Sequence, residues 1–134
     1  MAETMRLMPE EWVREFHEIF GASIAVKPNV PLTQVRRTLL KEEWEELDEE
    51  LALLEETNTI TPNLIKEMTD LQYVLSGLAV VYNIDLNKAV EIVHQSNLSK
   101  LGDDGKPIFR GDGKFLKGKN YVPADVSSLV PNVS

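Results

Sequence analysis

The chain has 134 residues, the length of a single domain that can bury its own core. Hydrophobic residues make up 43% of it, which excludes an intrinsically disordered protein, and the lack of cysteine excludes disulfides, thiolate metal sites and cysteine nucleophiles. A net charge of −8 argues against a protein that binds a nucleic acid polymer through its phosphates. The sequence shows neither an apolar run that could span a membrane nor a secretory signal, so we expect a cytoplasmic protein.

A first helix is predicted from Pro9 to Gly21. Proline suits the first helical position, and the acids Glu10 and Glu11 suit the first turn. Apolar residues then recur at helical spacing: Trp12, Val13, Phe16, Ile19 and Phe20. His17 lies off this stripe, so we expect it at the surface or at the edge of the core.

Two further long helices are predicted. Residues 22–32 contain two prolines and are expected to form a connector, after which Thr33 caps a helix that runs to about residue 56. A threonine–proline pair begins the next helix, over residues 62–82. Gly77 in its middle predicts close helix packing, because glycine costs about 1 kcal/mol there relative to alanine.

Both of these helices carry carboxylates on their apolar faces when the residues are placed 100° apart on a helical wheel. The acids are Glu42, Glu43 and Glu46 in one helix and Glu67 and Asp70 in the other. Carboxylates on a core face are costly unless something compensates them, and a cluster of them cannot stay ionised without a cation. Mg²⁺ prefers oxygen ligands, so the pattern predicts a cage for this ion.

A fourth helix is predicted after Asp85, its expected N-cap. Its inward stripe is Leu86, Ala89, Val90, Val93 and Leu101. Asn97 and Lys100 extend the stripe at the last turn, where a lysine also suits the helix dipole.

The tail, residues 102–134, is rich in glycine and locally basic. We expect a loop, or a short hairpin around residues 111–114, with residues 121–123 docking it. The charge opposite to that of the acidic helices favours a lid over an anionic ligand. Together these features indicate metal-assisted phosphoryl chemistry, in which lysines and Arg110 neutralise phosphates.

The pattern Glu42-Glu43-x-x-Glu46 followed by Glu67-x-x-Asp70 resembles the signature of the all-α nucleoside triphosphate pyrophosphohydrolases. That superfamily includes MazG-like proteins, dimeric dUTPases and phosphoribosyl-ATP pyrophosphohydrolases. Further segments resemble its single-domain MazG-like branch: Glu15-Phe16-His17, Arg37-Thr38-Leu39-Leu40, Asp70-Leu71-x-Tyr73-Val74, Val93-His94-x-x-Asn97-x-Ser99-Lys100, Asp112-Gly113-Lys114, and Lys117-Gly118 with Pro123-Ala124-Asp125. The resemblance extends over roughly residues 12–126.

The resemblance and the helical pattern imply an all-α protein, a bundle of four main helices with a glycine- and lysine-rich C-terminal loop. We expect one domain over residues 1–134, with a helical core over residues 9–101 and a basic lid or tail over residues 102–134. The resemblance also implies a homo-oligomer, most simply a dimer. Short helices with wide apolar faces agree, because they bury more surface by pairing.

The activity that the resemblance implies is Mg²⁺-dependent hydrolysis of a nucleoside triphosphate to the monophosphate and pyrophosphate, with Mn²⁺ as a substitute ion. By matching positions, the implied metal ligands are Glu42, Glu46, Glu67 and Asp70. Glu43 would be the base or water-positioning group, with metal binding as its alternative role. The implied substrate contacts are Asn97, Lys100, Lys114 and Lys117.

Three alternatives stay open at the level of sequence. A phosphoribosyl-ATP pyrophosphohydrolase activity would use the same acids. A di-iron bundle needs two Glu-x-x-His pairs, and Glu91-x-x-His94 supplies one, whereas Arg14 stands three residues before His17. A non-catalytic helical module could bind a basic partner, although this does not explain acids on apolar faces.

Overall fold

The structure is a computed structural model, and it describes residues 9–132. Its elements are α1 Pro9–Phe20, α2 Val30–Thr57, α3 Pro62–Val81, α4 Leu86–Leu98, the strands β1 Ile108–Phe109 and β2 Phe115–Leu116, and a 3₁₀ turn, η2, at Ser127–Leu129. The prediction of an all-α protein with four main helices is confirmed. Contacts separate the described residues into two compact units, residues 9–84 with 131–132 and residues 85–130.

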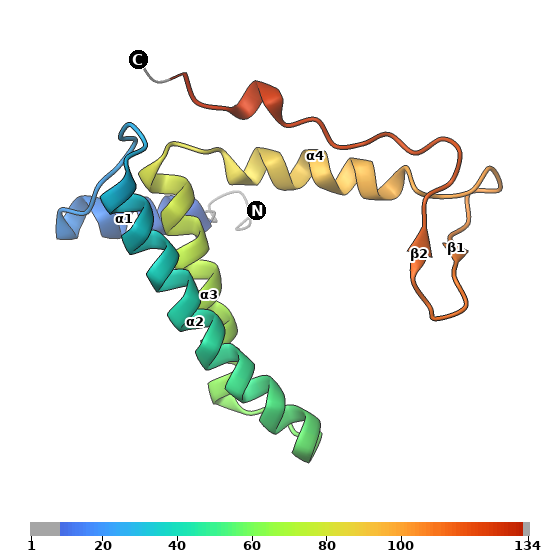
Figure 1. Ribbon diagram of the computed structural model, residues 1–134, viewed down its shortest axis with the longest axis horizontal. Coiled ribbons are helices and arrows are strands. Elements are labelled where there is room, and N and C mark those ends of the chain that lie inside the picture. The colour runs from blue at the N-terminus through green and yellow to red at the C-terminus, as the bar shows by residue number, and fades with distance from the viewer. Residues whose placement is uncertain (1–8, 133–134) are drawn as a thin grey trace, which may run out of the picture. The chain divides into compact units, whose positions relative to one another are not determined.

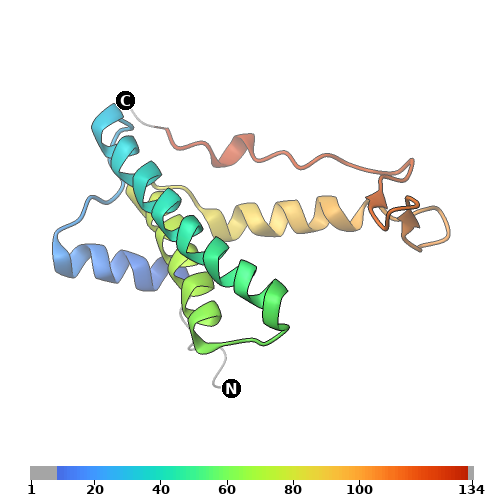
Figure 2. The ribbon, with the colours of Figure 1, turned by 60° about the horizontal axis from the view of Figure 1, so that its bottom comes forward.

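In the first unit, α2 and α3 lie side by side and antiparallel, and α1 lies across α3 (Figures 1 and 2). α2 begins at Val30, four residues before the start that a cap at Thr33 implies. The expected cap Thr33 is therefore wrong: the extended residue Asn29 caps the helix, and its side-chain oxygen accepts a hydrogen bond from the Leu32 N–H at 3.0 Å. Pro31 is tolerated because it lies in the first turn, where its missing N–H has no helical partner to lose.

α3 provides most of the buried core, and its C-terminal half contributes Ala79, Val80 and Val81. Gly77 marks the close packing that the sequence predicted: a Cβ at this position would lie 2.6 Å from Nη1 of Arg36 on α2. Burial lowers the pKa of Arg36 below its ordinary value. The guanidinium is thus seated on the small surface that glycine leaves open.

α1 turns a different face to α3 than the sequence predicted. His17, expected at the surface, is 3% exposed, whereas Ile19 and Phe20 are 69% and 70% exposed. The buried pair is Val13 and His17, four residues apart on one face. The Nδ1–H of His17 donates to the Ser23 carbonyl oxygen at 2.9 Å, which satisfies the ring inside the core.

The side of α2 that faces α3 also differs from the predicted face. Leu47 is buried and Arg36 reaches Gly77, but Val35 is 51% exposed. The sequence predicts Val35 and Leu47 on one apolar face of the helix, whereas in the structure the contact stripe is rotated away from Val35. Across the described residues, no helix combines the length and the apolar character needed to cross a membrane.

The second unit contains α4, the β1–β2 hairpin and the segment that follows it. Asp85 caps α4 as predicted, with Oδ1 accepting from the Lys88 N–H at 3.0 Å. The predicted hairpin is present, with Phe109 paired to Phe115 in an antiparallel register. Its first strand lies in the Lys106–Arg110 segment, to which the sequence assigned no role.

The predicted inward stripe of α4 is wrong at Val90 and Val93, which are 62% and 43% exposed, whereas Leu86 and Ala89 are half-buried. The face that packs within the second unit instead carries Ser96, which is buried. Its hydroxyl donates to the Val122 carbonyl oxygen at 2.7 Å, so the segment after the hairpin covers this side of α4.

Candidate metal centre

Four carboxylates meet between α2 and α3. One oxygen of each lies within 4.8 Å of one oxygen of every other, and we call this group the acidic cluster: Glu43, Glu46, Glu67 and Asp70. The antiparallel packing of the two helices explains the meeting. Residues three apart lie on one face of each helix, so the Glu-x-x-Glu pair and the Glu-x-x-Asp pair face each other.

The acidic cluster is only partly exposed to water. The Glu67 side chain is 14% exposed, and Oε2 of Glu43 and Oε2 of Glu67 are buried without a hydrogen-bond partner among residues 9–132. The neighbouring Glu46 carboxyl raises the pKa of Glu67, and burial raises it further. A buried ionised oxygen without a partner is costly, so the cluster favours a cation.

Lys66 is the cation that lies beside the cluster. Its Nζ is 2.6 Å from Oδ2 of Asp70 and 3.6 Å from Oε1 of Glu67. The hydrogen bond to Asp70 raises the pKa of Lys66 above its ordinary value. The ammonium donates a hydrogen bond to neither Oε2 of Glu43 nor Oε2 of Glu67, and it approaches Glu67 through Oε1.

Glu42 does not belong to the acidic cluster. Its side chain is exposed and lines a shallow groove of about 340 Å³ on α2, together with Val35 and Leu39. The structure therefore brings together four of the five acids that the sequence selected. The helical wheel could not separate Glu42 from Glu43, because neighbouring residues differ by only 100° and the orientation of α2 was unknown.

In the second unit, Asn97 and Lys100 lie together. Both line a cavity of about 180 Å³ whose other walls include Pro107, Ile108 and Phe115 from the hairpin region. The hairpin region thus forms one wall of the cavity that contains Asn97 and Lys100, the two residues that the resemblance assigns to substrate binding. An apolar wall next to an amide and an ammonium can hold a group that is partly flat and partly polar.

Lys114 and Lys117 do not line this cavity. The backbone N–H of Lys114 donates to Oδ1 of Asp112 at 3.1 Å, within the turn of the hairpin. Nζ of Lys117 lies 4.8 Å from the centre of the Tyr121 ring, a cation–π contact. Both side chains are exposed and hence accessible to an anionic ligand.

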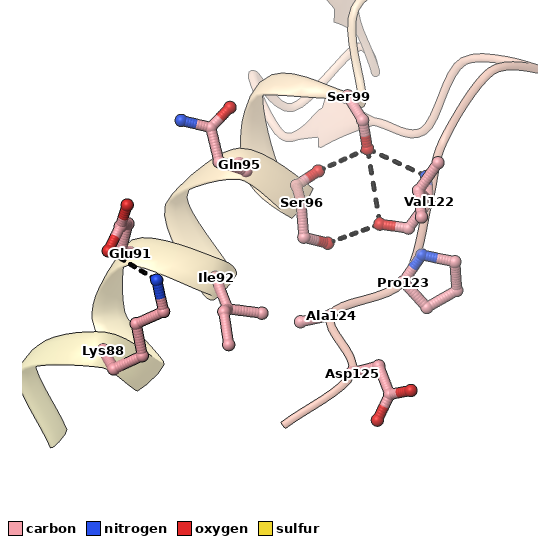
Figure 3. A pocket seen from close by; sticks show the side chains of 10 residues that line it. All are labelled: Lys88, Glu91, Ile92, Gln95, Ser96, Ser99, Val122, Pro123, Ala124 and Asp125. Carbon is pink, nitrogen blue, oxygen red and sulfur yellow. Dashed lines mark hydrogen bonds and ion pairs between the residues drawn. The ribbon is translucent and has the colours of Figure 1, made fainter. Parts of the chain in front are cut away.

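A second cavity of the same unit, about 520 Å³, lies between α4 and residues 122–125 (Figure 3). Ser99 closes one end of it: its hydroxyl donates to the Ser96 carbonyl oxygen at 2.6 Å and accepts from the Val122 N–H at 2.8 Å. Lys88 and Glu91 at the other end form an ion pair at 3.4 Å. The polar groups that line this cavity largely satisfy one another.

The sequence assigned no functional role to two residues near the acidic helices, Lys66 and Tyr73. Lys66 precedes Glu67 and reaches Asp70 one helical turn away, a spacing that could have identified it. Tyr73 meets Phe16 in an edge-to-face contact with ring centroids 5.9 Å apart. It also lines, with Trp12, a cavity of about 120 Å³ between α1 and α3.

A family model described as phosphoribosyl-ATP pyrophosphohydrolase matches residues 13–97, more than half of the chain. The chain belongs to this family. It is therefore a member of the MazG-like all-α nucleoside triphosphate pyrophosphohydrolase superfamily, as the sequence motifs predicted. Comparison with curated proteins gave no significant match. The matched residues include both acidic pairs and extend through Asn97, so the family assignment covers the whole acidic cluster.

Membership indicates a hydrolase that acts on a phosphoanhydride of a nucleotide and works with a divalent metal. The acidic cluster fits such an ion. All four donors are carboxylates, the ligand type that hard divalent cations prefer, and two of their oxygens are buried without a partner in the described part of the chain. Opposite ligands of Mg²⁺ lie about 4.2 Å apart, so oxygens within 4.8 Å of one another need to move little.

Proposed function

We propose that this protein hydrolyses a nucleoside triphosphate to the nucleoside monophosphate and pyrophosphate in a Mg²⁺-dependent reaction. Water adds to the α-phosphorus, and the bond between that phosphorus and the bridging α–β oxygen breaks, so that the β- and γ-phosphates leave together. The observation that carries the proposal is the acidic cluster, whose buried carboxylate oxygens lack partners among residues 9–132.

We further propose Glu46, Glu67 and Asp70 as ligands of Mg²⁺, with Glu43 completing the set. Glu43 has a second oxygen, so it can also position the attacking water and accept its proton. When bound, the ion would neutralise charge on the polyphosphate and lower the pKa of a coordinated water. Because Glu42 lies outside the cluster, the geometry favours Glu43 over Glu42 as the fourth ligand, and a ligand role for Glu42 stays a prediction.

Substrate contacts are proposed for the second unit. Asn97 and Lys100 share one cavity, which supports a common role in holding the nucleotide. Lys114 and Lys117 are exposed in the basic tail, and we propose that they bind the terminal phosphates. In this proposal residues 102–134 act as the lid of a single domain whose helical core is residues 9–101.

A second candidate substrate is phosphoribosyl-ATP, and the description of the matching family favours it. The same bond would break, since this compound also carries a triphosphate whose outer two phosphates leave as pyrophosphate. The acidic cluster serves both reactions equally, because it would act on the triphosphate and not on the base.

We also propose a homo-oligomer, most simply a dimer. In the first unit, large apolar side chains remain 40–70% exposed: Trp12, Phe16, Ile19, Phe20, Val35 and Trp44. So much apolar surface on two helices is unusual for a monomer and typical of an interface. Light scattering coupled to size exclusion should give at least twice the mass of 15.1 kDa; a monomer at micromolar concentration would refute this part.

The experiment that tests the function is pyrophosphate release from the ribo- and deoxyribonucleoside triphosphates and from phosphoribosyl-ATP, with Mg²⁺ and with EDTA. We expect metal-dependent release of pyrophosphate and a monophosphate product. Asp70→Asn should abolish it, whereas Asp48→Asn, on the exposed side of α2, should not. Release of orthophosphate, or full activity in EDTA, would contradict the proposal.

A further inference from the structure

We propose that Lys66 is a tethered counter-ion of the metal centre: its ammonium compensates the acidic cluster when no metal is bound and thereby weakens and tunes the affinity for Mg²⁺. The inference rests on the proposed metal site. It concerns a residue outside the carboxylate motifs, and it predicts that a cation beside the site opposes the binding of another cation.

Lys66 lies beside two members of the acidic cluster. Its Nζ is within 4.0 Å of two cluster members, 2.6 Å from Asp70 and 3.6 Å from Glu67. Both contacts come from one helix, because Lys66 directly precedes Glu67 and lies one turn before Asp70. The ammonium is therefore tethered beside the cluster by the fold of α3 and needs no other element to hold it.

The ammonium interacts with only some of the cluster's oxygens. It bonds to Oδ2 of Asp70 and approaches Oε1 of Glu67, while the buried Oε2 of Glu67 is left without a partner among residues 9–132. Oε2 of Glu43 is likewise buried and without a partner there. Lys66 thus lowers the net charge of the cluster and occupies one oxygen of Asp70, but it leaves the two buried oxygens without a partner. The ammonium therefore competes with a metal mainly through its charge.

The exposure of the ammonium sets the size of the effect. The Lys66 side chain is 65% exposed and the Asp70 side chain 34% exposed, so water and salt screen the interaction strongly. Exposed ion pairs are worth a factor of about two to five in an equilibrium constant. Lys66 should therefore tune the affinity for Mg²⁺ within that range and should not abolish binding.

The test is calorimetric titration of Mg²⁺ into metal-free protein at low salt. Lys66→Met should bind Mg²⁺ about two- to fivefold more tightly than the unmodified protein, and 0.5 M KCl should reduce the difference. Lys66→Arg keeps the charge and should retain the unmodified affinity. Met and Arg are both good helix formers, so both variants should keep α3 intact.

Lys41→Met is the matched control. Lys41 forms an ion pair of the same spacing with Glu45 on α2, at 4.0 Å, and its side chain is 76% exposed. The substitution removes the same charge from an exposed helical pair, but Glu45 lies outside the acidic cluster. In the same low-salt titration it should change the affinity for Mg²⁺ less than Lys66→Met does.

Thermal unfolding supplies a readout that does not depend on activity. Without metal, Lys66→Met should melt about 2–5 °C lower than the unmodified protein, because the cluster loses its counter-ion. Saturating Mg²⁺ should then raise its melting temperature more than it raises that of the unmodified protein. If Lys66 were an ordinary surface lysine, its substitution would behave like that of Lys41, and Mg²⁺ would raise the melting temperature as much as in the unmodified protein.

Equal or weaker Mg²⁺ binding by Lys66→Met would overturn the inference and leave the proposed metal site standing. Failure of the unmodified protein to bind Mg²⁺ at all would overturn the metal site itself, and this inference with it. The two failures are therefore distinguishable in one titration series.

Discussion

The charged side chains between α2 and α3 differ from those of the hairpin region in their burial and in their ion pairing. Between α2 and α3, four carboxylates meet with a single ammonium at their edge, and two of their oxygens are buried with no partner in the described residues. In the hairpin region, Arg110 pairs with Asp112 and Lys119 with Asp103, and all four side chains are more than half exposed. Charge that is buried and poorly compensated marks a ligand site, whereas exposed and paired charge marks an ordinary surface.

Part of the positive charge of the basic tail is already paired with carboxylates. The sequence shows lysines and Arg110 opposite in sign to the acidic helices, and predicts a lid. The structure shows that the Asp112 carboxylate already neutralises Arg110 and lies in the same turn. The free charge available to a phosphate is therefore smaller than a count of basic residues suggests, and Lys114 and Lys117 are better candidates than Arg110.

The largest effect is expected when one poorly compensated acid is removed. Glu67→Gln should weaken Mg²⁺ binding and lower kcat/KM by at least about a hundredfold, because a proposed ligand is lost. The same change should stabilise the metal-free protein, since it removes a charge from a crowded cluster. Glu49→Gln, on the exposed side of α2, is the control. Normal activity of Glu67→Gln would show that the cluster is not the metal site.

A smaller effect is expected at Gly118 in the hairpin region, because the atom closest to a Cβ added at this glycine belongs to the backbone. A Cβ at Gly118 would lie 2.4 Å from the Leu101 carbonyl oxygen, so Gly118→Ala should cost about 1–3 kcal/mol of local stability. Hydrogen exchange of the Gly118 N–H, which donates to Lys100 at 2.8 Å, would measure it. Gly111→Ala is the control, because a Cβ there meets no other heavy atom within 4 Å among the described residues. Equal exchange in both variants would contradict this prediction.

The pH dependence of stability should also differ between the two regions. The pKa of Glu67 is raised, so the metal-free folded state binds a proton that the unfolded state releases. The contribution of Glu67 to stability should therefore be fully present below its unfolded pKa and be lost as the pH rises through its raised folded pKa. Asp112 behaves oppositely, because Arg110 lowers its pKa. Urea unfolding in EDTA at several pH values should show that the free energy of unfolding falls less steeply with pH in Glu67→Gln than in the unmodified protein. An unchanged slope would refute this prediction.

The smallest effect is expected at Gly77. An added Cβ would meet the tip of the flexible Arg36 side chain and not backbone, and alanine is a better helix former than glycine by about 1 kcal/mol. Gly77→Ala should therefore change the free energy of unfolding by less than about 1 kcal/mol. A loss above about 2 kcal/mol in urea unfolding would show that the guanidinium cannot move and that Arg36 is fixed at this site.

Much of the candidate site was predictable because it depends on spacing along single helices. The Glu-x-x-Glu and Glu-x-x-Asp pairs lie on one face of any helix, and two antiparallel helices bring them together. The helix boundaries followed from Thr61, Asp85 and the glycine after α1, whose local signals act within one turn. The start of α2 was missed, because a proline inside a first turn looks like one that breaks a helix. The end of α4 was also missed, since the helix ends at Leu98 and leaves Lys100 and Leu101 beyond it.

The sequence by itself determined the all-α class, the family motifs and the identity of the acids, since these depend on residue type and on a 3.6-residue period. The tertiary structure decided how far each helix is rotated about its own axis. That rotation buried His17 instead of Ile19 and turned α2 so that Glu43, and not Glu42, meets Glu67. A rotation of one residue changes the contact by 100°, and only the packing of a neighbouring helix fixes it.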